Sequence, residues 1–242
     1  MSKVPGLGTL INAAGIVLGG VIGIFAGKKL NAQMRDMLSK VMGVSVIFIG
    51  AAGVLQHMLV VTADGIQTQG SMMMIFSLVL GGILGTLLRI EKNCERFGEW
   101  LKKKTGNSKD ARFVDGFVTA SLTVCIGAMA VMGAIADGMN GDYSILITKA
   151  ILDFVIILVM AASMGIGCIF SALPVILLQG SVTLLARLLT QVMTAGAISN
   201  LSLVGSVLIF GVGINLTFGK KIPVGDLLPS IVFAVIFSFI GL

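Results

Sequence analysis

The sequence predicts an all-α integral membrane protein, a polytopic bundle of about eight transmembrane helices. Three observations lead to this prediction: an apolar composition, apolar runs of membrane-spanning length, and basic residues gathered in only some of the intervening segments. Of the 242 residues, 56% are hydrophobic and 12% are charged, and the mean hydropathy is +1.05. A soluble domain carries roughly 25% charged residues. The chain therefore has too few charges to cover a water-facing surface.

Eight apolar segments are candidates for membrane spans. A spanning helix needs roughly 20 mainly apolar residues, because a helix satisfies its own backbone polar groups inside the hydrocarbon. The predicted spans cover approximately residues 7–26, 41–61, 72–90, 116–136, 144–164, 166–186, 201–218 and 226–242. The fifth and sixth are almost continuous around Gly165 and Gly167, and one long bent helix there would give seven spans. All of them belong to a single transmembrane domain, residues 1–242.

The distribution of basic residues predicts the orientation of the spans. Lys and Arg near span ends tend to remain in the cytoplasm. They follow the first, third and seventh spans, and those after the third form a basic cytoplasmic loop over residues 91–113, whereas residues 62–71 and 137–143 contain none. We therefore expect a multi-pass protein of the bacterial inner membrane with both termini outside. Arg187 does not fit this pattern, because the predicted path places it near the outer end of span six. Either it is an interface anchor or the span count is wrong.

An internal duplication is visible in the glycine-rich spans. The heptapeptide VLGGVIG at residues 17–23 recurs as VLGGILG at residues 79–85, and both copies lead into basic amphipathic segments. This match predicts helical-hairpin repeat units over residues 7–62 and 72–136, although glycine-rich apolar sequence also produces such matches by chance. Repeated helical units around a central site are a common plan of transporters.

Two charged residues in the fifth span are the strongest functional candidates. Lys149 and Asp153 are four residues apart, so they share one helical face and can pair. A charge inside the membrane is costly unless it is paired or hydrated. The functional interpretation is a proton or ion relay, or an anion contact at Lys149. In the alternative, Lys149 reaches the outer interface and Asp153 caps a neighbouring helix, but Asp153 is too short and too deep to reach water.

Three uncharged polar residues complete the candidate pathway. Asn12 lies in the first span, and Asn215 lies in the seventh within the glycine-rich residues 211–216. Glycines beside a buried carboxamide permit a broken helix whose free backbone groups coordinate a solute. The alternative is a hydrogen bond between tightly packed helices. Ser121 belongs to a run of hydroxyl residues in the fourth span, which can also bond back to their own helix.

Several classes of function are excluded by what the sequence lacks. It has no Walker loop, GxSxG, HExxH or paired-carboxylate pattern, so we expect neither an enzyme nor a cofactor. The three cysteines are far apart with no histidine nearby, so no metal site is predicted. The net charge of +6 comes from residues clustered between apolar runs, and nucleic-acid binding is therefore not expected.

Several short motifs together are characteristic of a known family. They are Gly8-Thr9 with Asn12 and Gly19-Gly20, Gly116-Phe117, Ala120-Ser121-Leu122, residues 125–130 (CIGAMA), Lys149 with Leu152-Asp153, residues 211–216 (GVGINL), and Leu227-Leu228-Pro229. In these motifs, along nearly its whole length, the chain resembles the bacterial inner-membrane proteins grouped as domain of unknown function 554. The resemblance implies a polytopic protein expected to transport, without an established substrate. It also brings the five polar candidates together in one set.

The sequence thus predicts a secondary transporter or channel for a small polar solute or ion of unknown identity. Its predicted pathway residues are Asn12, Ser121, Lys149, Asp153 and Asn215. The alternative is a non-transporting membrane scaffold that recruits a partner through the basic loop at residues 89–112. The expected partners are the lipid bilayer and, because of the glycine-rich packing faces and the repeated hairpin, further copies of the chain in a homo-oligomer.

Overall fold

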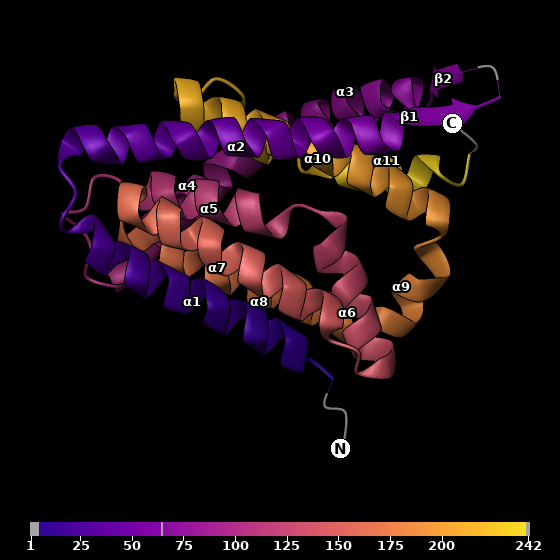
Figure 1. Ribbon diagram of the computed structural model, residues 1–242. Coiled ribbons are helices and arrows are strands. Elements are labelled where there is room, and N and C mark those ends of the chain that lie inside the picture. Colours follow the sequence, from indigo (N-terminus) through magenta and orange to yellow (C-terminus); the bar gives the residue numbers. More distant parts are fainter. Residues whose placement is uncertain (1–4, 64, 241–242) are drawn as a thin grey trace. The chain divides into compact units, whose positions relative to one another are not determined.

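The structure, a computed structural model, describes residues 5–63 and 65–240 and is largely helical (Figure 1). In chain order its elements are α1 (Leu7–Gly27), α2 (Ala32–Met58), β1 (Leu59–Thr62), β2 (Gly65–Thr68), α3 (Ser71–Leu88), α4 (Ile90–Lys104), α5 (Phe113–Cys125), α6 (Ala128–Asn140), α7 (Ser144–Met164), η1 (Ile166–Ser171), α8 (Ala172–Leu184), α9 (Ala186–Val192), α10 (Ala195–Phe218), η2 (Val224–Leu227) and α11 (Pro229–Phe237). The two strands pair as an antiparallel hairpin, with Leu59 opposite Thr68.

The predicted all-α membrane bundle is confirmed. Six of the described helices are long and apolar enough to cross a membrane: α1, α2, α3, α7, η1 with α8, and α10. The fourth predicted span is the pair α5 and α6, whose axes are bent by 63° at a short break. The eighth is a shorter apolar helix, Val224–Phe237, and the last two residues of its predicted range, 241–242, lie outside the described residues. The structure therefore has six or seven full-length candidates and one shorter helix.

The fifth and sixth predicted spans are separate helices. α7 ends at Met164, and Gly165 has a φ of +95°, a backbone conformation that glycine adopts without a steric penalty. A Cβ atom on Gly167 would overlap the Phe113 carbonyl oxygen, so the start of η1 lies directly against α5. The alternative of one long bent helix is therefore wrong, and the two glycines mark the change of direction.

The backbone of two segments is now defined. The basic segment after α3, predicted as a cytoplasmic loop between spans, is mostly the helix α4. It forms because apolar residues at helical spacing, including Leu101, pack against Phe113 and Phe117 on α5. In the seventh span the sequence left a broken helix or tight helix packing as alternatives for residues 211–216, and α10 runs without interruption from Ala195 to Phe218.

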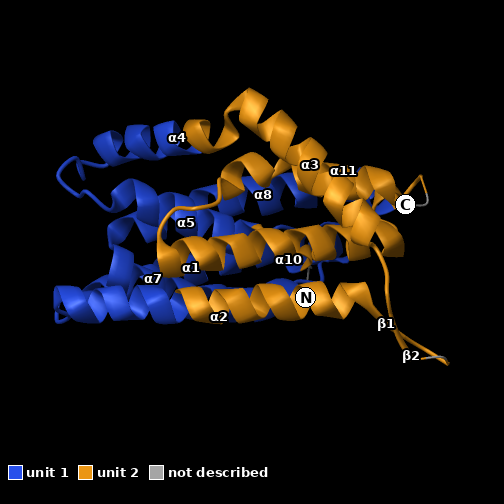
Figure 2. Ribbon diagram, turned by 90° about the horizontal axis from the view of Figure 1, so that it is seen from above, with its two compact units in different colours: residues 1–42, 94–125, 129–190 blue, residues 43–93, 126–128, 191–242 orange. Residues whose placement is uncertain are grey.

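The chain forms two compact units (Figure 2). Unit 1 takes residues 1–42, 94–125 and 129–190, and unit 2 takes residues 43–93, 126–128 and 191–242. Unit 1 contains α1, α5, most of α6, α7, η1 and α8, which carry most of the buried polar residues. Unit 2 contains α3, α10, η2 and α11 together with the larger part of α2.

The core of unit 1 is a close contact between α1 and α7, which lie side by side (Figure 1). Four glycines of α1, each four residues after the last, meet the α7 backbone at positions that also advance by four. The pairs are Gly15 with Ala150, Gly19 with Phe154, Gly23 with Leu158, and Gly27 with Ala162. The two helices are therefore parallel. Small residues allow such close approach, which drives helix association in membranes where lipid gives no hydrophobic force.

Unit 2 is also held together by glycines. Gly43 and Gly50 of α2 meet Thr217 and Phe210 of α10, so these helices are antiparallel. On α3, Gly81 and Gly85 meet the backbone of Ser230 and Asp226, an antiparallel contact as well. The duplicated glycines at 19 and 81 thus serve the same purpose, close approach, but toward partner helices of opposite direction. The repeat units themselves stay a prediction.

Candidate functional site

Lys149 and Asp153 form a buried ion pair on α7. The Lys149 Nζ atom lies 2.6 Å from Asp153 Oδ2, and the two side chains are 8% and 4% exposed. The spacing of four residues places both on the face of α7 that is covered by the rest of unit 1. Asp153 follows the start of α7 by nine residues, or roughly 13 Å at 1.5 Å per residue, so it is near the middle of the helix. Neither charge would be tolerated there alone.

The Lys149 ammonium also binds the backbone where the fourth span is broken. It donates to the Val124 carbonyl oxygen at a distance of 2.8 Å. In a continuous helix this carbonyl would accept from the amide of Ala128, but α5 stops at Cys125 and Ala128 begins α6. Gly127, with a φ of +139°, occupies the break. The break therefore frees a carbonyl that the lysine uses, and it links the ion pair to the bend between α5 and α6.

Asn12 of α1 lies beside this pair, and Thr9 precedes it by three residues on the same helix. Asn12 and Thr9 are 0% and 3% exposed, three residues apart on the face that packs in unit 1. The Asn12 carboxamide is close to the Asp153 carboxylate, but neither its nitrogen nor its oxygen completes a hydrogen bond of good geometry within the described chain. The Thr9 hydroxyl also has no partner among the described residues.

Gln179 of α8 extends this set of unpartnered groups. It is 1% exposed, and both of its side-chain polar atoms lack a hydrogen bond within the described chain. Gly20 meets Ile169, while the start of α1 and the end of α8 both meet α6 at residues 137 and 138. α8 is thus antiparallel to α1. Counting at 1.5 Å per residue from the contact between Gly20 and Ile169, Gln179 lies about 15 Å along α8. The same distance back along α1 reaches residue 10, so Gln179 is level with Thr9 and Asn12.

This arrangement of groups is suited to a hydrogen-bonding guest. The ion pair has no net charge, and in the same unit five buried polar atoms of Thr9, Asn12 and Gln179 have neither donor nor acceptor from the described chain. A buried polar atom left without a partner costs about 1–3 kcal/mol. Water or a small solute with both donors and acceptors supplies such partners in proteins. We refer to Thr9, Asn12, Lys149, Asp153 and Gln179 as the unit 1 polar cluster.

The other two predicted pathway residues are not hydrogen-bonded to this cluster. Ser121 is half-buried on α5 and donates to the Phe117 carbonyl of its own helix at 2.6 Å. Asn215 belongs to unit 2, where its side chain holds the loop after α10. It donates to the Ile222 carbonyl at 2.7 Å and accepts from the amides of Lys221 and Ile222. Their roles in a pathway stay predictions.

The structural role of Asn215 can be measured directly. Asn215→Ala removes three hydrogen bonds, and we expect it to destabilise unit 2 by roughly 1–3 kcal/mol and to open the loop. Trypsin cleavage after Lys220 or Lys221 should become faster, measured by mass spectrometry in detergent. Asn215→Asp keeps the two acceptor bonds and should be cleaved at an intermediate rate. Equal cleavage of all three proteins would contradict this role.

Three elements of the site were not found from the sequence. Gln179 is a single carboxamide within an apolar segment of the sequence, and this polar residue in an apolar segment could have identified it. The freed Val124 carbonyl was signalled by Gly127 within a predicted span. Asp137, expected in an outer loop, is fully buried, and its Oδ2 atom accepts from the amides of Gly6 and Gly8 at 3.2 and 3.0 Å. It thereby caps the start of α1, where an acid is favoured by the helix dipole.

Long apolar helices around buried and paired charges define a polytopic membrane protein. The chain belongs to the family described as "Protein of unknown function (DUF554)", whose model matches residues 7–239. It is 28% identical to the "Uncharacterized membrane protein YdfK" of Bacillus subtilis (strain 168), with 96% of each chain covered. It is 26% identical to the "Uncharacterized protein YqgA" of Escherichia coli (strain K12), with 94% of each covered. No solved structure gives a significant match.

Proposed function

We propose that the protein is a secondary transporter or channel for a small polar solute or ion across the bacterial inner membrane. One observation carries this proposal. Unit 1 holds a buried ion pair at a broken helix, and the same unit contains five buried polar atoms without partners in the described chain. Asn12, Lys149 and Asp153 are the proposed pathway residues, joined by Gln179. Ser121 and Asn215 remain proposed members on the sequence argument alone.

A purely structural role accounts poorly for this cluster. Buried ion pairs add little net stability, and well-packed apolar residues in their place are often as stable or more so. Small residues already hold α1 to α7, so the helices do not need the charges for association. Intramembrane ionisable groups that persist despite their cost commonly mark ion or substrate pathways. The proposed role explains both the pair and the unsatisfied carboxamides with one occupant.

We propose that both termini are outside, and the two ends of unit 1 support this position for the N-terminus. The start of α1 and the buried Asp137 share one end. Gly27 and Ser163 lie at the other end, where they receive hydrogen bonds from Arg35 and Arg112. Basic residues at that end favour a cytoplasmic location. Arg187 is exposed at the Asp137 end, because Gly138 meets Ala186 directly before it, which suits an interface anchor.

A scaffold that recruits a partner through residues 89–112 is the second candidate. Its support is α4, which carries three consecutive lysines at its end and exposes 55% of Trp100 beside Phe97. Replacing Lys102, Lys103 and Lys104 by alanine separates the two proposals, since transport through unit 1 should be unchanged.

The homo-oligomer stays a prediction. The glycine faces are occupied by contacts within the chain, so they no longer argue for it. We propose no catalytic activity.

The test replaces the unpartnered carboxamides by leucine. Asn12→Leu and Gln179→Leu remove buried groups that have no hydrogen-bond partner among the described residues, so thermal stability in detergent should stay equal or rise. Flux in proteoliposomes should nevertheless fall to that of protein-free liposomes. Flux is followed with a pH-sensitive dye under an imposed potassium potential, and by light scattering during swelling in urea, glycerol or glycine. Gln33→Leu, which removes an exposed carboxamide of α2, is the matched control.

Two results would contradict the proposal. Leucine variants that are stable and conduct as well as the wild type would make the carboxamides structural. Wild-type protein with no flux above protein-free liposomes, for protons and for every solute tested, would favour the scaffold.

A further inference from the structure

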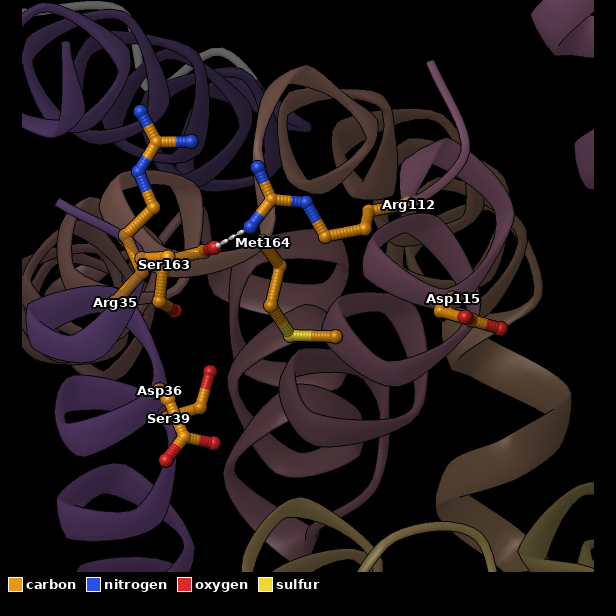
Figure 3. Close-up of a pocket in the computed structure, with 8 residues that line it drawn as sticks. Arg35, Asp36, Ser39, Arg112, Asp115, Ser163 and Met164 are labelled. Carbon is orange, nitrogen blue, oxygen red and sulfur yellow. Dashed lines mark hydrogen bonds between the residues drawn. The ribbon is translucent and has the colours of Figure 1, made fainter.

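A second polar feature lies at the opposite end of unit 1 from Asp137. A pocket of about 300 Å³ is lined by two arginines, two aspartates and two serines, with Ala32 and Met164 as its apolar part. These polar residues are Arg35, Asp36, Ser39, Arg112, Asp115 and Ser163 (Figure 3). None of them belongs to the unit 1 polar cluster, so a ligand can be assigned to this pocket without assuming the proposed transport function.

The two arginines are held at the ends of the parallel helices α1 and α7. Arg35 Nη2 donates to the Gly27 carbonyl, and Arg112 Nη1 donates to the Ser163 carbonyl, each at 2.8 Å. These hydrogen bonds fix both guanidinium groups in place. The carboxyl ends of helices also favour cations. A guanidinium has five N–H donors in a rigid fork. The bonds to the Gly27 and Ser163 carbonyl oxygens use one nitrogen of each arginine, so further donors remain for a ligand. The Arg35 Nε atom is buried without a partner among the described residues.

The acidic side chains do not neutralise these guanidinium groups. In Figure 3 the carboxylates of Asp36 and Asp115 lie apart from the two arginine forks. Asp36 pairs with Lys40 at 2.7 Å instead. In the part of the chain that the structure describes, neither Arg35 nor Arg112 is within ion-pair distance of a carboxylate. The pocket therefore offers two unneutralised forks together with the separate Asp115 carboxylate.

This combination fits a phosphate joined to an ammonium group. Arginine forks match the oxygens of phosphate in bidentate geometry. A separate carboxylate in the same pocket suits a primary ammonium, which can donate three hydrogen bonds. We propose that this pocket binds the phosphoethanolamine headgroup of a phospholipid, with the phosphate on Arg35 and Arg112 and the ammonium on Asp115. Ser39 is a further donor to the phosphate.

The position of the pocket favours a lipid over a free phosphate compound. It lies where the membrane-spanning helices α1 and α7 end, at the boundary between apolar helix surface and charged residues. Lipid headgroups occupy this depth, and basic pockets between helices at the cytoplasmic side are a known mode of headgroup binding. Its volume of about 300 Å³ lies at the lower end of ligand pockets, the size of a headgroup rather than of a large metabolite.

The test measures bound lipid by native mass spectrometry. Purified protein is equilibrated with equal amounts of phosphatidylethanolamine, phosphatidylglycerol and phosphatidylcholine. The wild type should retain phosphatidylethanolamine preferentially. The double variant Arg35→Lys with Arg112→Lys keeps a cation on each helix end but loses both forks, and it should lose most of this retention. Asp115→Asn should keep the phosphate contact and bind the three lipids equally. Arg187→Gln, an exposed arginine at the other end of unit 1, should behave as the wild type.

The controls make each outcome decisive. Thermal unfolding of the lysine variant should match the wild type, which separates lost lipid from lost fold. If that variant unfolds early, the Asp115→Asn comparison still decides the proposal. Equal retention of all lipids by the wild type, or unchanged selectivity in Asp115→Asn, would overturn it. Displacement of the lipid by millimolar inorganic phosphate would overturn the lipid source.

Discussion

Proteoliposomes containing the Asp153→Asn protein are expected to show no more flux than protein-free liposomes. Asparagine has nearly the same size and can still accept a hydrogen bond from Lys149, so packing is conserved. It cannot carry a negative charge or exchange a proton in this range of pH, and it leaves the ammonium of Lys149 without a counter-charge. The pH-sensitive dye and the swelling assay provide the measurement, with Asp36→Asn as a matched control. Asp36 is also paired with a lysine four residues away, but that pair is exposed.

A loss of flux through misfolding can be separated from a loss of the pathway. Lys149→Met alone leaves Asp153 buried without a partner, and we expect it to lower the free energy of unfolding by about 3–5 kcal/mol. The double variant Lys149→Met with Asp153→Leu leaves no charge, so it should be nearly as stable as the wild type but inactive. Stability is followed by circular dichroism during titration with sodium dodecyl sulfate. A stable double variant with wild-type flux would show that the ion pair is structural.

The sequence was sufficient for those parts of the fold and site that depend on local spacing. Lys149 and Asp153 had to share a helical face because they are four residues apart, and their pairing is a consequence of the cost of isolated charge in an apolar bundle. Spans were likewise predictable, since length and hydropathy decide them. The separation of α7 from η1 could not be decided, because Gly165 in an apolar run permits either a bend or a reversal.

Features that depend on contacts between distant segments were not predictable from one sequence. Gln179 lies level with Thr9 and Asn12 only because α8 is antiparallel to α1, a relation that neither segment encodes alone. For Asn215 the sequence left a broken helix and tight helix packing as alternatives, and in the structure the glycines serve close packing while α10 stays continuous. The break occurs instead at Gly127, where the Lys149 ammonium compensates the freed carbonyl. Glycine thus marks both close approach and broken helices, and only the tertiary partner distinguishes them.

The close contact between α1 and α7 positions Asn12 beside the ion pair, which gives the second large expected effect. Gly19→Ala would place a Cβ atom in overlap with the Phe154 carbonyl oxygen, and the adjoining atoms are backbone that cannot turn aside. The helices must separate, so we expect a loss of about 1–3 kcal/mol or more in the free energy of unfolding, the usual cost of overpacking. Flux should fall as well, because α1 carries Asn12 away from Asp153.

A matched glycine on α8 serves as the control for this substitution. No atom lies within 4 Å of a Cβ built on Gly180, so Gly180→Ala adds a methyl group without a collision. Alanine is favoured over glycine in a helix by about 1 kcal/mol, and this variant should be as stable as the wild type or more so. Both proteins are compared in the same detergent titration, with the single tryptophan, Trp100, as a fluorescent probe. If Gly19→Ala unfolds at the wild-type midpoint, then α1 is not held against α7 at this distance, and the placement of Asn12 in the polar cluster fails with it.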